Sequence, residues 1–292
     1  MNRATICLLF AFVGLAQEPV QVIVTAEGRH GHTAPEVGRG DVQVLEGKDR
    51  LSVADWVPLA GARADLQLCI LIDDSAGSLG PQLEDIRAFV RSQDPATAVA
   101  IGYMRNGTTV FAQPFTKDRE AAAKSVRLPL SSFGANASPY FALEDLIQKW
   151  PPSGARREAI MLSDGIDRYG GSDPQNPYVL SAIEKTQRAG IVVYSIYVSG
   201  VGHFSHSLWS VTIGQSFLSE LSERTGGESY TQGFQTPISL TPYLDEIEHR
   251  LHSQYRLSFV PKAGTKPGML RFRLHTELPN VDLATQEQVY VP

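Results

Sequence analysis

The stretch LQLCILIDDSAGSLG, residues 66–80, decides the fold because a run of apolar residues ends abruptly in two carboxylates, followed by hydroxyls and glycines. The near-continuous apolarity up to Ile72 is typical of an inner parallel strand that is covered on both faces. Asp73 then lies just beyond the carboxyl edge of the expected sheet, and ligands bind at this edge in open α/β sheets. The first candidate site residues are therefore Asp73, Asp74, Ser75 and Ser78.

From residue 66 to about residue 252, apolar strands alternate with amphipathic helices. TAVAIGYM and TTVFAQPF predict two strands joined by a tight turn at Asn106-Gly107. REAIMLSDGID, residues 157–167, predicts a second buried strand that ends in acidic residues, and IVVYSIYVSG predicts a third. Strands separated by helices indicate βαβ units. We therefore expect an α/β fold with a doubly wound, mostly parallel sheet of the Rossmann type.

Both ends of the chain have the sequence pattern of β structure. Residues 20–60 contain alternating segments with a hairpin turn at residues 46–49, and the tail contains QYRLSFVP, MLRFRLH and QVYVP. We expect these segments to pack together as a small accessory β region built from both chain ends. The predicted organisation is an N-terminal β segment at 17–62, an α/β domain at 63–253 and a C-terminal β segment at 254–292.

The amino terminus predicts export. It has a basic start at Arg3, an apolar run over residues 4–13, and small residues before a polar continuation, which is the layout of a secretory signal peptide at residues 1–16. We expect a secreted or periplasmic protein; an uncleaved amino-terminal anchor is the alternative. No later segment approaches the roughly 18 to 20 apolar residues of a membrane span. Without Cys7, the mature chain keeps only Cys69, which excludes a disulfide framework.

The composition narrows the class of partner. The 292 residues carry a formal net charge of -5, and lysine and arginine form no cluster along the chain. Nucleic-acid-binding proteins have a basic patch or stripe that neutralises phosphates. A nucleic-acid partner is therefore not expected, whereas 42% hydrophobic residues are enough for a sizeable core.

Three landmarks in order resemble the von Willebrand factor A (vWA) domain. They are the apolar strand that runs into D-x-S at Asp73, the segment ANASPYFAL at 135–143 where the family has G-G-T-x-L-Y-x-A-L, and the strand AIMLSDGID at 159–167, similar to L-x-D-G-x-D. The resemblance implies a vWA fold. The flanking β segments, the signal peptide and the ending HRLHSQYRLSFVP resemble more specifically the secreted bacterial proteins of the acidobacterial-type VWFA-related group.

The resemblance also implies a metal-ion-dependent adhesion site. In this family D-x-S-x-S, a distant threonine and a distant aspartate hold Mg²⁺ or Mn²⁺, and a carboxylate of a protein partner completes the metal shell. Gly77 and Ala137 occupy two of the five ligand positions and have no side-chain oxygen, but Ser78 and Ser138 each lie one residue beyond. The implied metal ligands are Asp73, Ser75 and Asp164, with Ser78 and Ser138 as substitutes.

The residues themselves leave two interpretations of this edge open. Asp73 and Asp164 at neighbouring strand ends raise each other's pKa, and a cation would relieve that repulsion. Alternatively, each carboxylate accepts backbone N–H bonds in its own loop. Asp167 and Asp173 add acidic groups nearby. The His30/His32 and His203/His206 pairs are expected to be ordinary loop residues, because neither has a carboxylate partner at ligand spacing.

Three functions follow from these observations. The first is a secreted binding or adhesion protein that recognises a protein or surface ligand at a partly degenerate metal site. The second is a metal-free structural or assembly module. The third, a metal-assisted hydrolase, is disfavoured because the D-x-D of dehalogenase-like phosphatases is broken at Ser75 and no P-loop, G-x-S-x-G or H-E-x-x-H is present. We therefore do not expect an enzyme.

Overall fold

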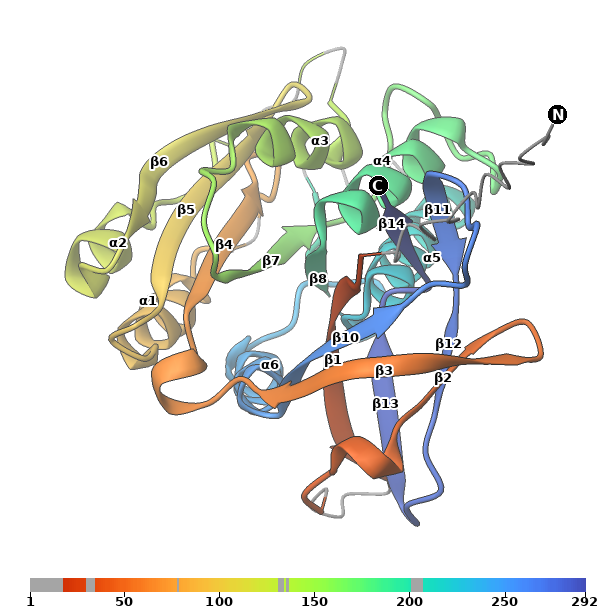
Figure 1. Cartoon of the computed structure of the whole chain (residues 1–292). Coiled ribbons are helices and arrows are strands. Elements are labelled where there is room, and N and C mark those ends of the chain that lie inside the picture. The colour runs from red at the N-terminus through yellow and green to blue at the C-terminus, as the bar shows by residue number, and fades with distance from the viewer. Residues whose placement is uncertain (1–17, 30–34, 78, 131–133, 135–136, 201–206) are drawn as a thin grey trace, which may run out of the picture.

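The computed structural model describes residues 18–29, 35–77, 79–130, 134, 137–200 and 207–292. These residues form an α/β part and an accessory antiparallel sheet that packs at one end of it (Figure 1). The predicted signal peptide, residues 1–16, lies outside the described residues. Within them, no helix combines the length and the apolarity that crossing a bilayer requires.

The α/β part is built on a six-stranded sheet in the order β6-β5-β4-β7-β8-β9. All neighbouring strands are parallel except β5 and β6, which form an antiparallel hairpin across Asn106 and Gly107, both with positive φ. The chain winds outward from β4 in both directions, so β4 and β7 flank the switch point where ligands bind in such sheets. The strands are β4 (Leu66–Asp73), β5 (Ala98–Arg105), β6 (Thr108–Thr116), β7 (Arg156–Ser163), β8 (Ile191–Tyr197) and β9 (Ser229–Tyr230). The expected doubly wound α/β fold is confirmed.

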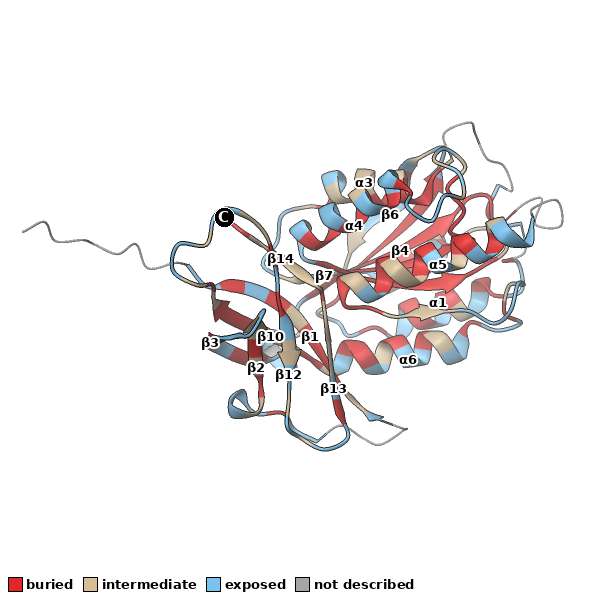
Figure 2. Ribbon diagram, turned by 90° about the vertical axis from the view of Figure 1, so that its right-hand side faces the viewer, coloured by how far each residue is buried: buried red, intermediate tan, exposed pale blue. Residues whose placement is uncertain are grey.

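Six helices cover the two faces of this sheet. Alternate residues of β4 point to opposite faces, so Leu68 and Ile70 pack under α1, α2 and α6, whereas Cys69 and Leu71 pack under α3, α4 and α5. Figure 2 shows the buried residues along the strands and on the inward sides of the helices. The helices are α1 (Leu83–Ser92), α2 (Arg119–Ser125), α3 (Pro139–Lys149), α4 (Pro177–Ala189), α5 (Leu208–Thr225) and α6 (Thr241–His252).

The accessory sheet combines both ends of the chain, as expected. Its order is β12-β2-β3-β10-β1-β13, and β11 and β14 form a separate antiparallel pair. The strands are β1 (Val20–Gly28), β2 (Gln43–Glu46), β3 (Asp49–Pro58), β10 (Gln254–Val260), β11 (Gly268–Arg271), β12 (Arg273–His275), β13 (Val281–Thr285) and β14 (Gln288–Val291). Two 3-10 turns, η2 (Arg39–Asp41) and η3 (Gly61–Arg63), complete the elements.

The segment MLRFRLH differs from the expected single strand. It divides at Phe272, so β11 pairs with β14 while β12 pairs with β2. The side chain of Phe272 is buried against Phe259, with ring centroids 5.0 Å apart. Burial of the Phe272 ring stabilises the interruption between β11 and β12. The alternation of apolar and polar residues in the segment does not reveal this interruption.

A buried arginine connects the accessory sheet to the α/β part. Arg250 of α6 is 7% exposed and donates to Glu27 of β1 at 2.9 Å and to Glu228, just before β9, at 3.0 Å. Because Glu228 directly precedes β9, this cluster lies at the amino edge of the parallel sheet, where the strands begin. The carboxyl edge, with Asp73, is therefore at the opposite end from the accessory sheet (Figure 1).

Candidate functional site at the carboxyl edge

Asp73 ends β4 with its carboxylate already hydrogen-bonded. The side chain is buried, and Oδ1 accepts from the backbone N–H of Ser75 at 2.9 Å and from the Ser75 hydroxyl at 2.7 Å. Oδ2 accepts from the hydroxyl of Ser163, at the end of β7, at 2.9 Å. Burial, together with the negative charge of Asp164, raises the pKa of Asp73 above its ordinary value.

Asp164 follows β7 and forms a buried ion pair. Its Oδ1 accepts from the backbone N–H of Ile166 at 3.0 Å, and its Oδ2 accepts from the guanidinium of Arg168 at 2.7 Å. The side chain of Arg168 is only 11% exposed. Burial alone would lower the pKa of Arg168, but the charges of Asp164 and Asp73 raise it. Arg168 therefore supplies the positive charge that two neighbouring carboxylates need.

The loop that carries Arg168 turns sharply because of a glycine. Gly165 has φ 69°, and a Cβ at this position would lie 2.2 Å from the carbonyl oxygen of Gly214 in α5. The Tyr140 hydroxyl of α3 donates to the Gly165 carbonyl at 2.9 Å. The glycine of the D-G-x-D pattern is thus explained by a left-handed backbone in close contact with a helix. This turn directs Arg168 back toward Asp164.

The residues around Asp73 do not fit a magnesium or manganese ion. Asp73, Ser75, Ala137, Ser138 and Arg168 line a cleft of about 10 Å³, close to the minimum that holds one water. Magnesium keeps several waters in near-octahedral geometry. The Ser138 hydroxyl caps α3 by accepting from the backbone N–H of Phe141 at 3.4 Å, and Arg168 brings a cation to the same cleft.

Among the described residues, the other positions of the expected ligand set add no side-chain oxygen to this cleft. Gly77 and Ala137 have no side-chain oxygen, and Ser78 lies outside the described residues. In the described part of the chain, no three histidine, cysteine, aspartate or glutamate side chains form a group that could hold a metal. The structure thus brings Asp73, Ser75 and Ser138 to one cleft, and joins Asp164 to it through an arginine.

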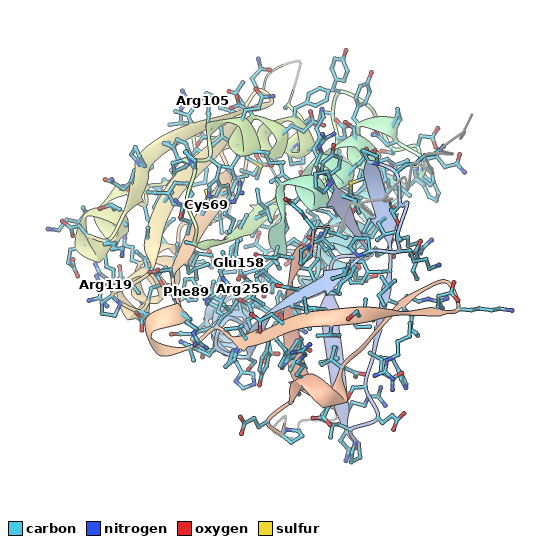
Figure 3. All side chains as sticks on the ribbon, viewed as in Figure 1. Cys69, Phe89, Arg105, Arg119, Glu158 and Arg256 are labelled. Carbon is cyan, nitrogen blue, oxygen red and sulfur yellow. The ribbon has the colours of Figure 1, made fainter. Side chains whose placement is uncertain are left out.

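Asp74 turns away from this cleft. Its buried carboxylate accepts from Arg127 at 2.8 Å, from Arg105 at 3.0 Å and from the backbone N–H of Leu130 at 2.9 Å. Burial would raise the pKa of Asp74, but these bonds, with the one from Arg127 foremost, hold the pKa below its ordinary value. Figure 3 labels Arg105 at the outer end of β5. Asp74 therefore fastens the segment before α3 to the end of β4.

The other acidic residues of this edge organise their own loops. Asp167 is buried and accepts from the backbone N–H of Tyr169 at 3.1 Å and from the Asn176 amide at 2.8 Å. Asp173 is exposed and accepts from the backbone N–H of Gln175 at 2.9 Å. The loop-capping alternative that the sequence left open concerned Asp73 and Asp164, and both do accept a backbone N–H in their own loops, from Ser75 and Ile166. The histidine pairs at 30/32 and 203/206 lie outside the described residues.

Sequence reasoning missed the partners of these carboxylates. It did not single out Arg168, Ser163, Arg105 or Arg127, because arginines in polar loops are common. A signal for Arg168 was present: it lies four residues after Asp164, beyond a glycine that favours a tight turn. Nothing local indicated that Arg127, 53 residues after Asp74, would contact it.

Exposed apolar side chains gather at the same edge. Ten large hydrophobic residues are exposed in the described part; among them Val110 lies in β6 opposite Tyr103, and Leu180 is the fourth residue of α4. The other eight lie in connections between elements or in the first turn of a helix: Leu128, Leu130, Tyr169, Tyr178, Leu208, Trp209, Phe234 and Ile238.

Three of the aromatic rings at this edge form a cluster. The ring centroids of Phe141, Tyr169 and Tyr178 lie 5.1 to 5.2 Å apart, with interplanar angles of 56° to 82°. Such tilted and edge-to-face contacts hold the rings in a defined arrangement. Because Tyr169 is 51% exposed and Tyr178 is 37% exposed, this ordered aromatic surface faces solvent.

Comparison with known proteins found similarity at the level of solved structures. No family model and no curated protein matches the chain. It is similar to BatB, a conserved hypothetical protein of Bacteroides thetaiotaomicron, with 15% identity over 64% of this chain and 97% of that one, and a TM-score of 0.45. It is also similar to the VWA domain of SpRpn10, with 12% identity, coverage of 62% and 94%, and a TM-score of 0.41.

A third similar structure is proximal thread matrix protein 1 of the mussel byssus, with 15% identity over 72% of this chain and 48% of that one, and a TM-score of 0.45. At these values the similarities concern the fold only. The fold is therefore described from its own strand order and from the switch point between β4 and β7. Membership of the acidobacterial-type group stays a prediction from sequence.

Proposed function

We propose that this chain is an exported protein-binding module whose recognition surface is the carboxyl edge of its α/β sheet. The observation that carries the proposal is the gathering of exposed apolar and aromatic side chains in the loops and helix starts of that edge. Aromatic residues are enriched at protein interfaces, where a few of them contribute most of the binding energy. Export rests on the predicted signal at residues 1–16.

We further propose that recognition is independent of a metal ion. Arg168 neutralises the Asp73 and Asp164 pair, so the edge needs no divalent cation for its own stability. The metal-dependent version, in which Mg²⁺ or Mn²⁺ binds an acidic residue of the partner, requires Arg168 to leave the cleft. The small cleft also argues against a hydrolase, because both oxygens of Asp73 are engaged and about 10 Å³ holds no substrate.

The test is a quantitative capture experiment. The mature chain, immobilised through its C-terminus, is incubated with the exported proteins of the source organism, and retained proteins are quantified by mass spectrometry. Tyr169→Ser with Trp209→Ser removes two exposed rings, 51% and 59% exposed, from the edge. The control is Arg50→Ser with Arg273→Ser, which removes two exposed long side chains from β3 and β12 of the accessory sheet, at the opposite end of the molecule.

We expect a partner that the wild type and the control retain and the edge variant loses, equally with EDTA and with magnesium. Loss in the control as well, or retention in the edge variant, would contradict the location of the surface. Capture that EDTA abolishes and magnesium restores would overturn metal independence and support the metal-dependent adhesion site instead.

A further inference from the structure

A second feature lies at the opposite edge, where the accessory sheet meets the α/β sheet. A cavity of about 420 Å³ opens there between β1 and the amino ends of β4, β7 and β8. Its walls come from six separate segments of the chain, including Ile23 of β1, Leu59 after β3, Ala155 before β7 and Gly190 before β8. The volume is within the range of roughly 300 to 1,000 Å³ that small-molecule sites occupy.

Positive charge dominates the lining of this cavity. The lining includes one acidic residue, Asp65. It also includes four arginines: Arg63, Arg156, Arg157 and Arg256. Figure 3 labels Arg256 beside the junction of the two sheets. Such a concentration of one sign is unusual in a chain with a net charge of -5.

One of these arginines has a structural role. Arg156 is 5% exposed and donates to the Glu158 carboxylate at 3.2 Å, and to the carbonyl oxygens of Ala64 and Leu251 at 3.0 Å each. Glu158 is its ion-pair partner, and its donors hold η3 and the end of α6 against β7. Arg156 therefore shapes the cavity and is not available to bind a ligand.

The other three arginines have no such partners. In the part of the chain that the structure describes, Arg63, Arg157 and Arg256 form no ion pair and no side-chain hydrogen bond, and Asp65 pairs with none of them. Like charges that converge on a concave surface repel each other and focus a positive potential into it. A bound anion would remove that repulsion.

We infer that this cavity binds a small organic molecule that carries a phosphate group. The planar guanidinium fork of arginine matches the oxygens of phosphate and forms paired, charge-assisted hydrogen bonds with them. Arg63, Arg157 and Arg256 hold the phosphate, while Val22, Ile23 and Leu59 contact the apolar part of the molecule. The bounded volume excludes a nucleic acid strand, and the chain's net charge of -5 disfavours long polyanions.

The experiment uses phenyl phosphate as the probe, with phenol as its uncharged analogue and inorganic phosphate as its headgroup alone. Isothermal titration of the full mature chain measures binding at low ionic strength. We expect phenyl phosphate to bind more tightly than inorganic phosphate, and phenol not to bind. Each of Arg63→Gln, Arg157→Gln and Arg256→Gln should weaken phenyl phosphate about tenfold, the loss expected for one charge-assisted hydrogen bond.

Lys117→Gln is the matched control, because it removes one exposed positive charge from the connection between β6 and α2. The three arginine variants should keep the melting temperature of the wild type or exceed it, since no ion pair is lost. A tighter affinity for inorganic phosphate than for phenyl phosphate would limit the site to a free phosphate. Absence of binding at millimolar probe, or equal weakening by Lys117→Gln, would overturn the inference.

This site is independent of the proposed recognition surface. The triple arginine variant should retain the partner captured at the carboxyl edge, whereas the Tyr169→Ser with Trp209→Ser variant should bind phenyl phosphate as the wild type does. Failure of one proposal therefore leaves the other intact.

Discussion

Arg168 donates to Oδ2 of Asp164 at 2.7 Å in the loop after β7, beside the point where the doubly wound sheet reverses its strand order. Each of the two central strands delivers one carboxylate to this point, Asp73 after β4 and Asp164 after β7. Two buried like charges require a cation. In this chain the cation is the side chain of Arg168, from the loop that follows Asp164. The charges of the two carboxylates are therefore neutralised without an ion from the medium.

Replacement of Arg168 should show that the stability of the fold depends on its positive charge. Arg168→Ala leaves Asp73 and Asp164 uncompensated, and we expect the free energy of unfolding to fall by about 3 to 5 kcal/mol, as for other broken buried pairs. It also frees the cleft, so 10 mM magnesium should raise the melting temperature of this variant and not that of the wild type. Differential scanning fluorimetry measures both effects.

Arg168→Lys is the control for that experiment, because it keeps the charge and loses only the planar fork. It should cost less stability than Arg168→Ala and show no response to magnesium. A magnesium-dependent rise in the wild type would contradict the assignment of Arg168 as the resident cation.

Asp74 should control the segment that carries Leu128 and Leu130. Asp74→Asn removes the charge that holds Arg105 and Arg127, and we expect a loss of about 2 to 3 kcal/mol in the free energy of unfolding. The backbone N–H of Leu130, which donates to Asp74, should exchange with deuterium faster. Asp145→Asn removes a carboxylate that also binds a backbone N–H and a lysine, but at α3, and should leave Leu130 exchange unchanged.

Glu158 should make stability depend on pH. Burial, only partly offset by Arg156, raises the pKa of Glu158 from 4.5 to about 7. Between these values the folded state binds more protons than the unfolded state, so the free energy of unfolding falls as pH rises through 7. Glu158→Gln imitates the protonated acid. It should match the wild type at pH 4 and exceed it by about 3 kcal/mol at pH 8, from the size of the pKa difference.

Urea unfolding of both proteins at several pH values measures that difference directly. Other carboxylates with shifted pKa values, such as Asp73, contribute equally to both proteins and cancel in the comparison. A difference that shrinks as pH rises would have the wrong sign and would contradict the buried, proton-binding state of Glu158.

Arg250 should couple the accessory sheet to the α/β part. Arg250→Met leaves Glu27 and Glu228 without their shared cation, and we expect a loss of about 3 to 5 kcal/mol. In a double-mutant cycle, Glu27→Gln should recover part of that loss, with a coupling of about 1 kcal/mol or more. Purely additive effects in denaturant unfolding would mean that the contact with β1 contributes nothing.

Much of the fold could be predicted because it is encoded in local pattern. The apolar run of residues 66–72, the Asn106-Gly107 turn and the helix that ends at Gly190 each depend on residues close in sequence. The same periodicities placed the accessory strands at both chain ends. The division of β11 from β12 at Phe272 was missed, because burial of that ring depends on β10, and no local signal reports it.

The sequence by itself determined that acidic residues stand where β4 and β7 end, because strand ends follow from hydrophobic pattern. Only the tertiary structure decided what those residues contact. Asp73 and Asp164 meet an arginine held by the turn at Gly165 against α5, while Asp74, the next residue after Asp73, meets arginines from β5 and from the segment before α3. The reason is physical: the direction of a side chain beyond a strand end depends on loops packed by distant parts of the chain, and pattern carries no information about them.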